Sequence, residues 1–154
     1  MPINLVKDIE KILNDKRFLL GIGGLARTII IRRVKSGFGV NNDTAKDPIQ
    51  VKLKSLSAGY IKRRTKVRLG EFGKPKRSNL TFTGELLNSI LVAAFSIQGI
   101  RLTINRKMRR DGMTNEEVAY WVGIDRPWFA LTVSEQRVIA NEIEKYLRTA
   151  LRRI

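Results

Sequence analysis

Residues 90–105, ILVAAFSIQGIRLTIN, are the stretch that decides the expected fold of this chain. Apolar side chains alternate with their neighbours over residues 90–97 and again over residues 100–105. Between the two runs lies Gln98–Gly99, a dipeptide suited to the tight turn of a hairpin. We therefore predict an antiparallel β-hairpin that lies in the core of the protein.

Helical spacing of apolar residues predicts helices on both sides of this hairpin. The expected helices are residues 4–15, 25–34, 55–66, 83–89, 114–122 and 134–153. Thr83, Ser134 and either Thr114 or Asn115 are the expected N-caps. The second segment contains the β-branched run Thr28–Ile31, so a strand is an alternative there.

The segments between these elements are expected to be loops. Residues 36–48 are rich in Gly and Asn, and residues 68–79 combine Gly with Lys and Arg. Gly21–Ile22–Gly23–Gly24 lacks both the Walker lysine and the Rossmann spacing, so we interpret it as a bend. The sequence predicts one α+β domain over residues 1–154: a helical segment 1–36 and a body 53–154 with a hairpin or sheet packed against helices, a long C-terminal helix and extended basic loops.

The composition argues against enzymatic chemistry. The 154 residues contain no Cys and no His, which removes disulfides, cysteine-based zinc sites and the commonest general base. The loop acids Asp43, Asp47, Glu71 and Asp111 are scattered and lack metal-ligand spacing. We therefore expect no enzyme, cofactor or metal site. The apolar stretch 18–31 is interrupted by glycines and Arg27, and residues 1–15 lack the pattern of a signal peptide, so we expect no membrane contact.

The basic charge is large and clustered. Thirty Lys and Arg oppose 14 Asp and Glu, for a net charge of +16. The residues expected to face DNA or an acidic partner are Lys62, Arg63, Arg64, Lys66, Arg68, Lys74, Lys76, Arg77, Arg106, Lys107, Arg109 and Arg110. Such clusters bind polyanions without sequence preference, and the alternative is a merely solvated face. They lack interleaved aromatic residues, which argues against base-specific recognition of single strands.

Four aromatic residues close to the last predicted helix are expected to lie in the core: Tyr120, Trp121, Trp128 and Phe129. Trp128 is also a candidate interface anchor. We predict that residues 126–129 form a rigid element that docks the terminal helix on the hairpin, because Pro127 fixes one backbone angle.

Three segments together resemble the tail-completion and virion-morphogenesis proteins of tailed phages. The first is the basic helix LKSLSAGYIKRRTK, residues 53–66. The second is LTFTGELLNSI, residues 80–90, which is similar to the family pattern Leu-x-x-Thr-Gly-x-Leu-x-x-Ser-Ile before a hairpin. The third is EVAYWVGIDRPWFALTVSEQRVIANEIEKYL, residues 117–147, with an Arg-Pro-aromatic-aromatic-x-Leu element before a terminal helix.

The resemblance implies a structural protein of the phage neck, assembled in the host cytoplasm and present in the virion. It implies a homo-oligomeric ring, most simply of six copies, that joins the connector or adaptor region to the tail terminator or tail tube. Non-specific contact with the DNA in the channel is also implied. The alternative from composition alone is a basic, non-catalytic protein that binds nucleic acid without sequence preference.

Overall fold

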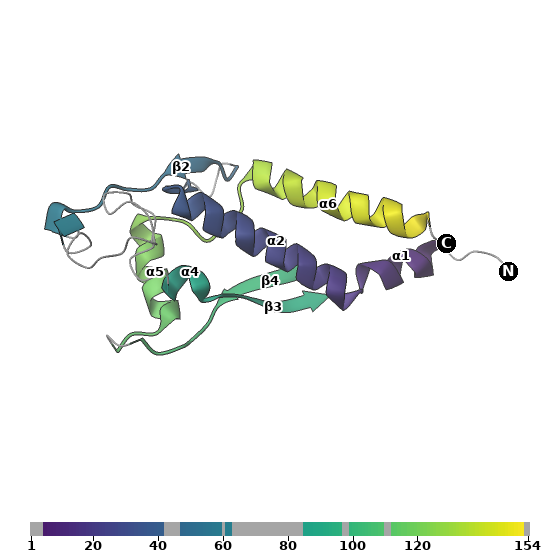
Figure 1. The fold of residues 1–154 in the computed structure, drawn as a ribbon, viewed down its shortest axis with the longest axis horizontal. Coiled ribbons are helices and arrows are strands. Elements are labelled where there is room, and N and C mark those ends of the chain that lie inside the picture. The colour runs from purple at the N-terminus through teal and green to yellow at the C-terminus, as the bar shows by residue number, and fades with distance from the viewer. Residues whose placement is uncertain are drawn as a thin grey trace.

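A long central helix, α2 (Lys16–Lys35), organises the protein. The computed structural model describes residues 5–41, 47–59, 61–62, 85–96, 99–109 and 112–152. Figure 1 shows α2 as the middle layer, with α6 (Val133–Leu151) along one side and the hairpin of β3 (Ile90–Ser96) and β4 (Gly99–Ile104) along the other. The remaining elements are α1 (Leu5–Leu13), β1 (Phe38–Val40), β2 (Gln50–Lys52), α4 (Glu85–Asn88) and α5 (Asn115–Asp125). The fold is α+β, as the sequence predicts.

The expected bend at the glycines is wrong, because α2 runs through them without a break. The helix begins at Asp15, whose carboxylate accepts the N–H groups of Arg17 at 2.8 Å and Phe18 at 3.4 Å. A Cβ atom on Gly23 would lie 2.7 Å from a methyl group of Val92 on β3. The glycine thus permits close contact between α2 and the hairpin, and this packing offsets the low helix propensity of glycine. The alternative of a strand at residues 28–31 is also excluded.

The predicted hairpin is confirmed, but Gly99, which was predicted in the turn, belongs to β4. Its register pairs Ile90 with Ile104 and Ser96 with Gly99, and a bulge lies between Val92 and Ala94. The Arg27 side chain crosses from α2 and donates from Nε to the carbonyl oxygen of Ile90 at 2.8 Å. The β3 edge of the sheet is therefore tied to the central helix by a polar contact as well as by packing.

A second ribbon lies within what the sequence predicts as a loop. β1 and β2 pair antiparallel, with Phe38 opposite Lys52 and Val40 opposite Gln50. Strands of three residues are too short to display an alternation, so the pattern of residues 36–48 contained no clear signal. Gly37 starts the ribbon with a φ of 89°, a left-handed conformation that favours glycine.

The helix caps agree only in part with the sequence. Thr114 caps α5 as predicted, but α6 is capped by Thr132 rather than by Ser134. At both ends a Thr hydroxyl and a Glu three residues later form a reciprocal capping box. The predicted cap Thr83 lies outside the described residues, as do residues 60 and 63–66 of the helix predicted at 55–66. In the described part of that segment, residues 58–59 and 61–62 are helical and residues 55–57 are not.

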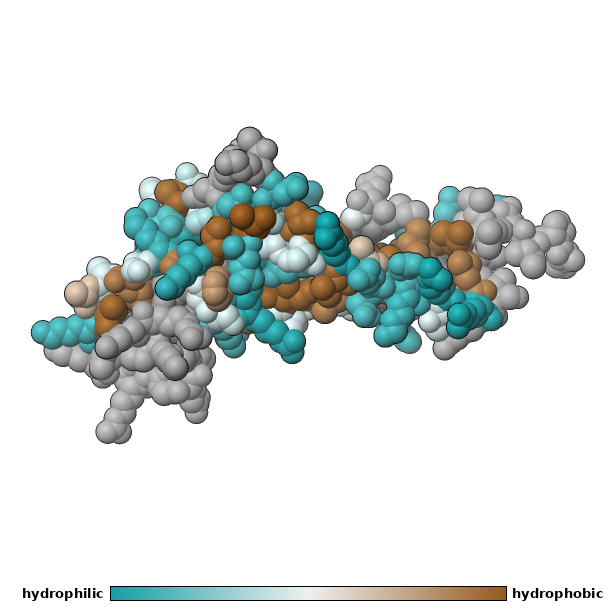
Figure 2. Space-filling model, turned by 90° about the horizontal axis from the view of Figure 1, so that it is seen from above, coloured by the Kyte–Doolittle hydropathy of each residue, from teal (hydrophilic) through white to brown (hydrophobic). Residues whose placement is uncertain are grey.

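The core lies where α2, the start of the hairpin and the segment before α6 meet. Its buried members are Ile30, Val34, Leu53, Leu86, Leu87, Ile90 and Trp128. No residue of α6 is fully buried. On the face that carries α6, hydrophobic residues lie in patches among hydrophilic ones (Figure 2). Within the described part of the chain, no helix combines the length and apolarity needed to cross a bilayer.

Candidate interaction surfaces

The structure describes only part of the predicted basic surface. Lys62, Arg106 and Lys107 are exposed, and Arg109 is largely covered. The other predicted contact residues lie outside the described residues: Arg63, Arg64, Lys66, Arg68, Lys74, Lys76, Arg77 and Arg110. Apart from Lys62, the described residues of this surface all lie in the chain that links β4 to α5.

Acidic side chains from other elements meet this connection, although the stretch itself contains none up to residue 110. The Nε atom of Arg106 lies 2.7 Å from a carboxylate oxygen of Glu116, and this exposed pair contributes little to stability. Arg109 lies 3.9 Å from Glu85, and its side chain is only 14 % exposed. Arg109 therefore packs against the body of the protein, whereas Arg106 and Lys107 face the solvent.

One face of α5 exposes large apolar side chains. Tyr120 is 66 % exposed, Trp121 is 61 % exposed and Ile124 is 52 % exposed. The two rings meet edge to face, with centroids 5.4 Å apart. The expectation that Tyr120 and Trp121 lie in the core is wrong. The other side of α5 packs on the core through Val118, Ala119 and Val122. The middle of the helix is apolar on every side, so its remaining apolar side chains face the solvent.

Among the described helices, α5, which carries this aromatic face, has the most negative net charge. α5 contains Glu116, Glu117 and Asp125 and no basic residue, in a chain of net charge +16. The Thr114 N–H group donates to the Glu117 carboxylate at 2.7 Å and the Thr114 hydroxyl at 2.9 Å, and these bonds lower the pKa of Glu117. We call Tyr120, Trp121 and Ile124, with the acids of α5, the α5 ridge.

The element at residues 126–129 docks differently from the prediction, because its backbone bonds to β1 and α2. Trp128 is 1 % exposed and belongs to the core, so it is no interface anchor. Phe129 is 37 % exposed and lies beside it, with ring centroids 5.3 Å apart. The carbonyl oxygen of Pro127 accepts the N–H of Val40 at 2.9 Å. A Cβ atom on Gly39 would lie 2.0 Å from that oxygen, so glycine is required at this contact.

A buried arginine fastens this element to α2 and α6. Arg33 donates through Nη2 to the carbonyl oxygens of Trp128 and Ala130, each at 2.7 Å, and through Nη1 to the Glu135 carboxylate. Burial lowers the pKa of Arg33, and the Glu135 charge acts in the opposite direction. This network was not predicted from the sequence. The available signal was the position of Arg33 on the buried stripe of α2, three residues after Ile30.

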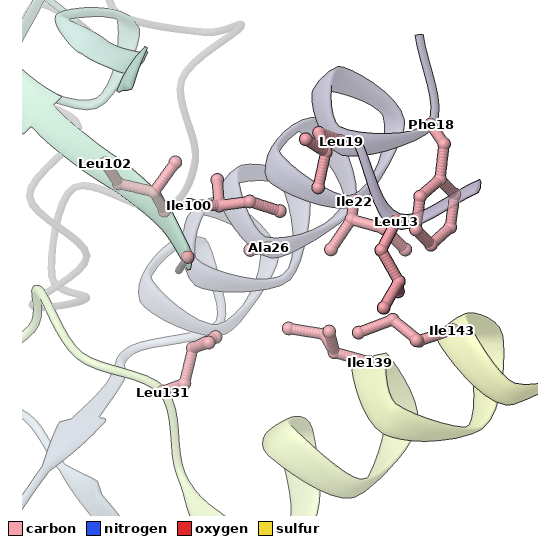
Figure 3. A pocket seen from close by; sticks show the side chains of 11 residues that line it. Leu13, Phe18, Leu19, Ile22, Ala26, Ile100, Leu102, Leu131, Ile139 and Ile143 are labelled. Atoms are coloured by element: carbon pink, nitrogen blue, oxygen red, sulfur yellow. The ribbon is translucent and has the colours of Figure 1, made fainter. Parts of the chain in front are cut away.

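A second apolar surface is concave and lies along the first half of α2. This groove has a volume of about 330 Å³. Its lining residues are Leu13, Phe18, Leu19, Ile22, Ala26, Gly99, Ile100, Leu102, Leu131, Ile139 and Ile143. Figure 3 shows the side chains of α2, β4 and α6 converging on the space. Five separate segments form the groove, so no local sequence pattern could have indicated it.

Among the described residues, no three Asp, Glu, His or Cys side chains lie close enough to hold a metal ion. Of the loop acids considered in the sequence, Asp47 is exposed and Asp43, Glu71 and Asp111 lie outside the described residues. The arrangement offers three surfaces for binding: an acidic ridge, an apolar groove and an exposed basic connection. No protein-family model, curated protein or solved structure matches the chain.

Proposed function

We propose that this chain is a non-catalytic structural subunit of a tailed-phage neck, a tail-completion protein that forms a ring between the connector or adaptor region and the tail. The observation that carries the proposal is the combination of a packed core with large aromatic side chains that are exposed on α5. An exposed tryptophan and tyrosine on one helix are typical of interface centres, where these residues are enriched. A subunit that works by contact needs such surfaces and no reaction centre.

The family-like segments also fit structural roles. Leu86, Leu87 and Ile90 of the second segment are buried and lead from α4 into β3. The Arg-Pro-aromatic element of the third segment places Trp128 in the core and leads into α6. These motif residues therefore serve the packing of the core, which fits a structural role.

The basic residues supply the second part of the proposal. Arg106 and Lys107 are exposed beside α5, and the neck offers two polyanions, the DNA in the channel and acidic patches of neighbouring proteins. Contact with DNA would be indifferent to base sequence and would weaken steeply with salt. Contact with an acidic protein patch would depend on the position of each charge.

The test is an infection experiment in the phage that encodes the chain. Removing the gene should leave DNA-filled heads and separate tails that do not join, as seen by electron microscopy. A complementing copy with Arg63→Glu, Arg64→Glu, Arg106→Glu and Lys107→Glu should fail to restore joined particles while the purified variant stays folded. Arg109 is left unchanged, because its side chain is only 14 % exposed and a carboxylate at this covered position would lie against Glu85.

A matched control distinguishes loss of the basic connection from a general effect of the changed net charge. The variant with Arg32→Glu, Lys35→Glu, Lys52→Glu and Arg137→Glu makes the same change of charge at exposed positions that lie outside the basic connection, the α5 ridge and the lining of the groove. It should restore joined particles at least partly. Normal particles from both variants would contradict the role of the basic connection. Normal particles without the gene would overturn the neck function and favour the free nucleic-acid-binding alternative.

A further inference from the structure

The α5 ridge and the apolar groove are two apolar surfaces that the described fold leaves open. The ridge is convex and is formed by Tyr120, Trp121 and Ile124. The groove is concave and is walled by α2, β4 and α6. Figure 1 places α5 toward one end of an elongated molecule and the first half of α2, with α1, toward the other. One molecule therefore cannot bring its own ridge into its own groove.

We infer that the α5 ridge of one copy inserts into the apolar groove of the next copy, so that copies of this chain associate head to tail. The two surfaces are different, so the contact is heterologous. Such contacts generate a ring when the rotation closes and a filament when it does not. The inference deepens the proposed function and rests on it only for the expectation that the ring closes.

The sizes of the two surfaces agree. A cavity of about 150 Å³ lined by aliphatic side chains binds benzene, so the groove of about 330 Å³ has room for an indole ring and part of a neighbour. The groove is lined by apolar residues, and Figure 3 shows Ile139 and Ile143 of α6 facing Leu19, Ile22 and Ile100 across it. Trp121 is the side chain on the ridge that has the size and exposure to fill this space.

The charges of the two surfaces are complementary. α5 contains three acids and no base, whereas α2 contains six bases and no acid. β4, on the other wall, contributes Arg101 and no acid, and α6 and α1 are each balanced. Lys16 and Arg17 are exposed next to Phe18 and Leu19, which line the groove. Opposite charges around an apolar contact steer the two surfaces together and disfavour the reverse pairing, in which like charges would meet.

The ion pairs within one copy that involve acids of the ridge are weak, so pairs with a neighbouring copy can replace them. Glu116 pairs with Arg106 and Asp125 lies 3.5 Å from Lys54, and all four side chains are more than half exposed. Exposed pairs of this kind contribute only about 0–1 kcal/mol. A neighbouring copy that offers Lys16 and Arg17 would therefore meet little competition for these carboxylates.

Sedimentation of the purified full chain over a range of concentrations tests the contact without any phage component. Association should increase with salt, because the repulsion between copies of charge +16 is screened while the apolar contact remains. Trp121→Ala should weaken self-association roughly thirtyfold or more, the size expected for a central interface residue. Ile49→Ala, at an exposed apolar site outside both surfaces, should leave it unchanged.

Mixing two defective variants provides the decisive result. Trp121→Ala keeps an intact groove, and Ile139→Glu keeps an intact ridge but places a carboxylate in the groove. Each variant alone should be monomeric, and a mixture should form a dimer that grows no further, because only one productive contact is left. Ile143→Gln serves as a milder groove variant if Ile139→Glu does not fold, as judged by circular dichroism.

Tryptophan fluorescence gives an independent readout. Trp128 is buried and Trp121 is exposed, so quenching by acrylamide reports on Trp121 and should decrease as copies associate. A mixture that stays monomeric, association that survives Trp121→Ala, or unchanged quenching on association would each overturn the inference. If Ile139→Glu abolishes association and Trp121→Ala does not, another part of the neighbour occupies the groove. Failure of this contact would leave the neck function to its own infection test.

Discussion

α5 and the segment that follows it, residues 126–135, contain the same local features, but one is exposed and the other belongs to the core. Each contains a tryptophan, and each contributes the glutamate of a Thr-x-x-Glu capping box. In the second region Trp128 is buried and Glu135 pairs with Arg33. In α5, Trp121 is exposed and Glu117 bonds only with Thr114, among the bonds the structure describes. The difference shows that a local motif sets where a helix begins, while a partner from elsewhere decides whether it becomes core or surface.

Truncating the buried tryptophan is the largest change that this comparison predicts. Trp128→Ala should lower the free energy of unfolding by about 3–5 kcal/mol, because it leaves a cavity among Ile30, Val34 and Leu87. Phe129→Ala should cost clearly less, since that ring is 37 % exposed. Urea unfolding of the two variants measures both. Equal losses would mean that the neighbouring rings share the packing role, contrary to the structure.

The sequence predicted the elements that depend on local pattern. The hairpin at residues 90–105, the long terminal helix and the Thr114 cap follow from alternation, helical periodicity and capping chemistry. The burial of aromatic residues depends on distant partners, so Trp121 and Trp128 could not be separated by composition. The continuity of α2 through its glycines depends on the contact of Gly23 with Val92, which is 69 residues away along the chain.

The candidate surfaces were less predictable than the fold, for the same reason. The basic stretch 101–110 has no acid within it, yet Glu85 and Glu116 approach it from α4 and α5. The groove is formed by segments that are adjacent only after folding. Sequence reasoning therefore found the charge and its sign but could not place the contact surfaces.

Removing the charge that Arg33 requires is the next largest effect. Glu135→Gln keeps a side chain that can complete the capping box but leaves a buried guanidinium without its carboxylate. We expect a loss of about 3 kcal/mol in the free energy of unfolding, the lower end of the range for a broken buried pair. Glu117→Gln in α5 is the matched control and should change stability little.

A double variant tests whether the lost free energy of unfolding in Glu135→Gln comes from the unpaired charge of Arg33. Arg33→Met combined with Glu135→Gln removes both members of the pair and should recover part of the loss, since no unpaired buried charge remains. The same urea titration measures it. Additive losses in the double variant would instead place the cost on the carbonyl groups of Trp128 and Ala130, which lose their donor in this variant.

The two capping threonines provide a finer comparison. Thr132→Ala should lower the free energy of unfolding by about 1–2 kcal/mol and Thr114→Ala by about 0.5–1 kcal/mol, within the range measured for N-caps. The larger value is expected for Thr132 because it is 2 % exposed and starts the helix that packs along α2. Thermal unfolding followed by circular dichroism distinguishes them, and a reversed order would contradict the comparison.

The smallest expected effect is a change in acid sensitivity at the exposed cap of α5. The Thr114 N–H and hydroxyl bonds hold the pKa of Glu117 below its ordinary value of 4.5 in the folded protein. The folded state therefore binds a proton at Glu117 less readily than the unfolded state does. The stabilisation from this carboxylate is complete above the ordinary pKa and is lost as the pH falls through the lowered one.

Glu117→Gln should accordingly flatten the dependence of stability on pH below about 4.5, because the amide cannot take up the proton that weakens the cap. Asp15→Asn should act in the same direction at the start of α2, where the Arg17 N–H, followed by the Tyr146 hydroxyl, lowers the pKa of Asp15. The measurement is urea unfolding at a series of acidic pH values for wild type and both variants. If the free energy of unfolding fell more steeply with acid in Glu117→Gln than in wild type, the capping bond of α5 would be absent in solution. The Thr-x-x-Glu capping box would then be formed only at α6.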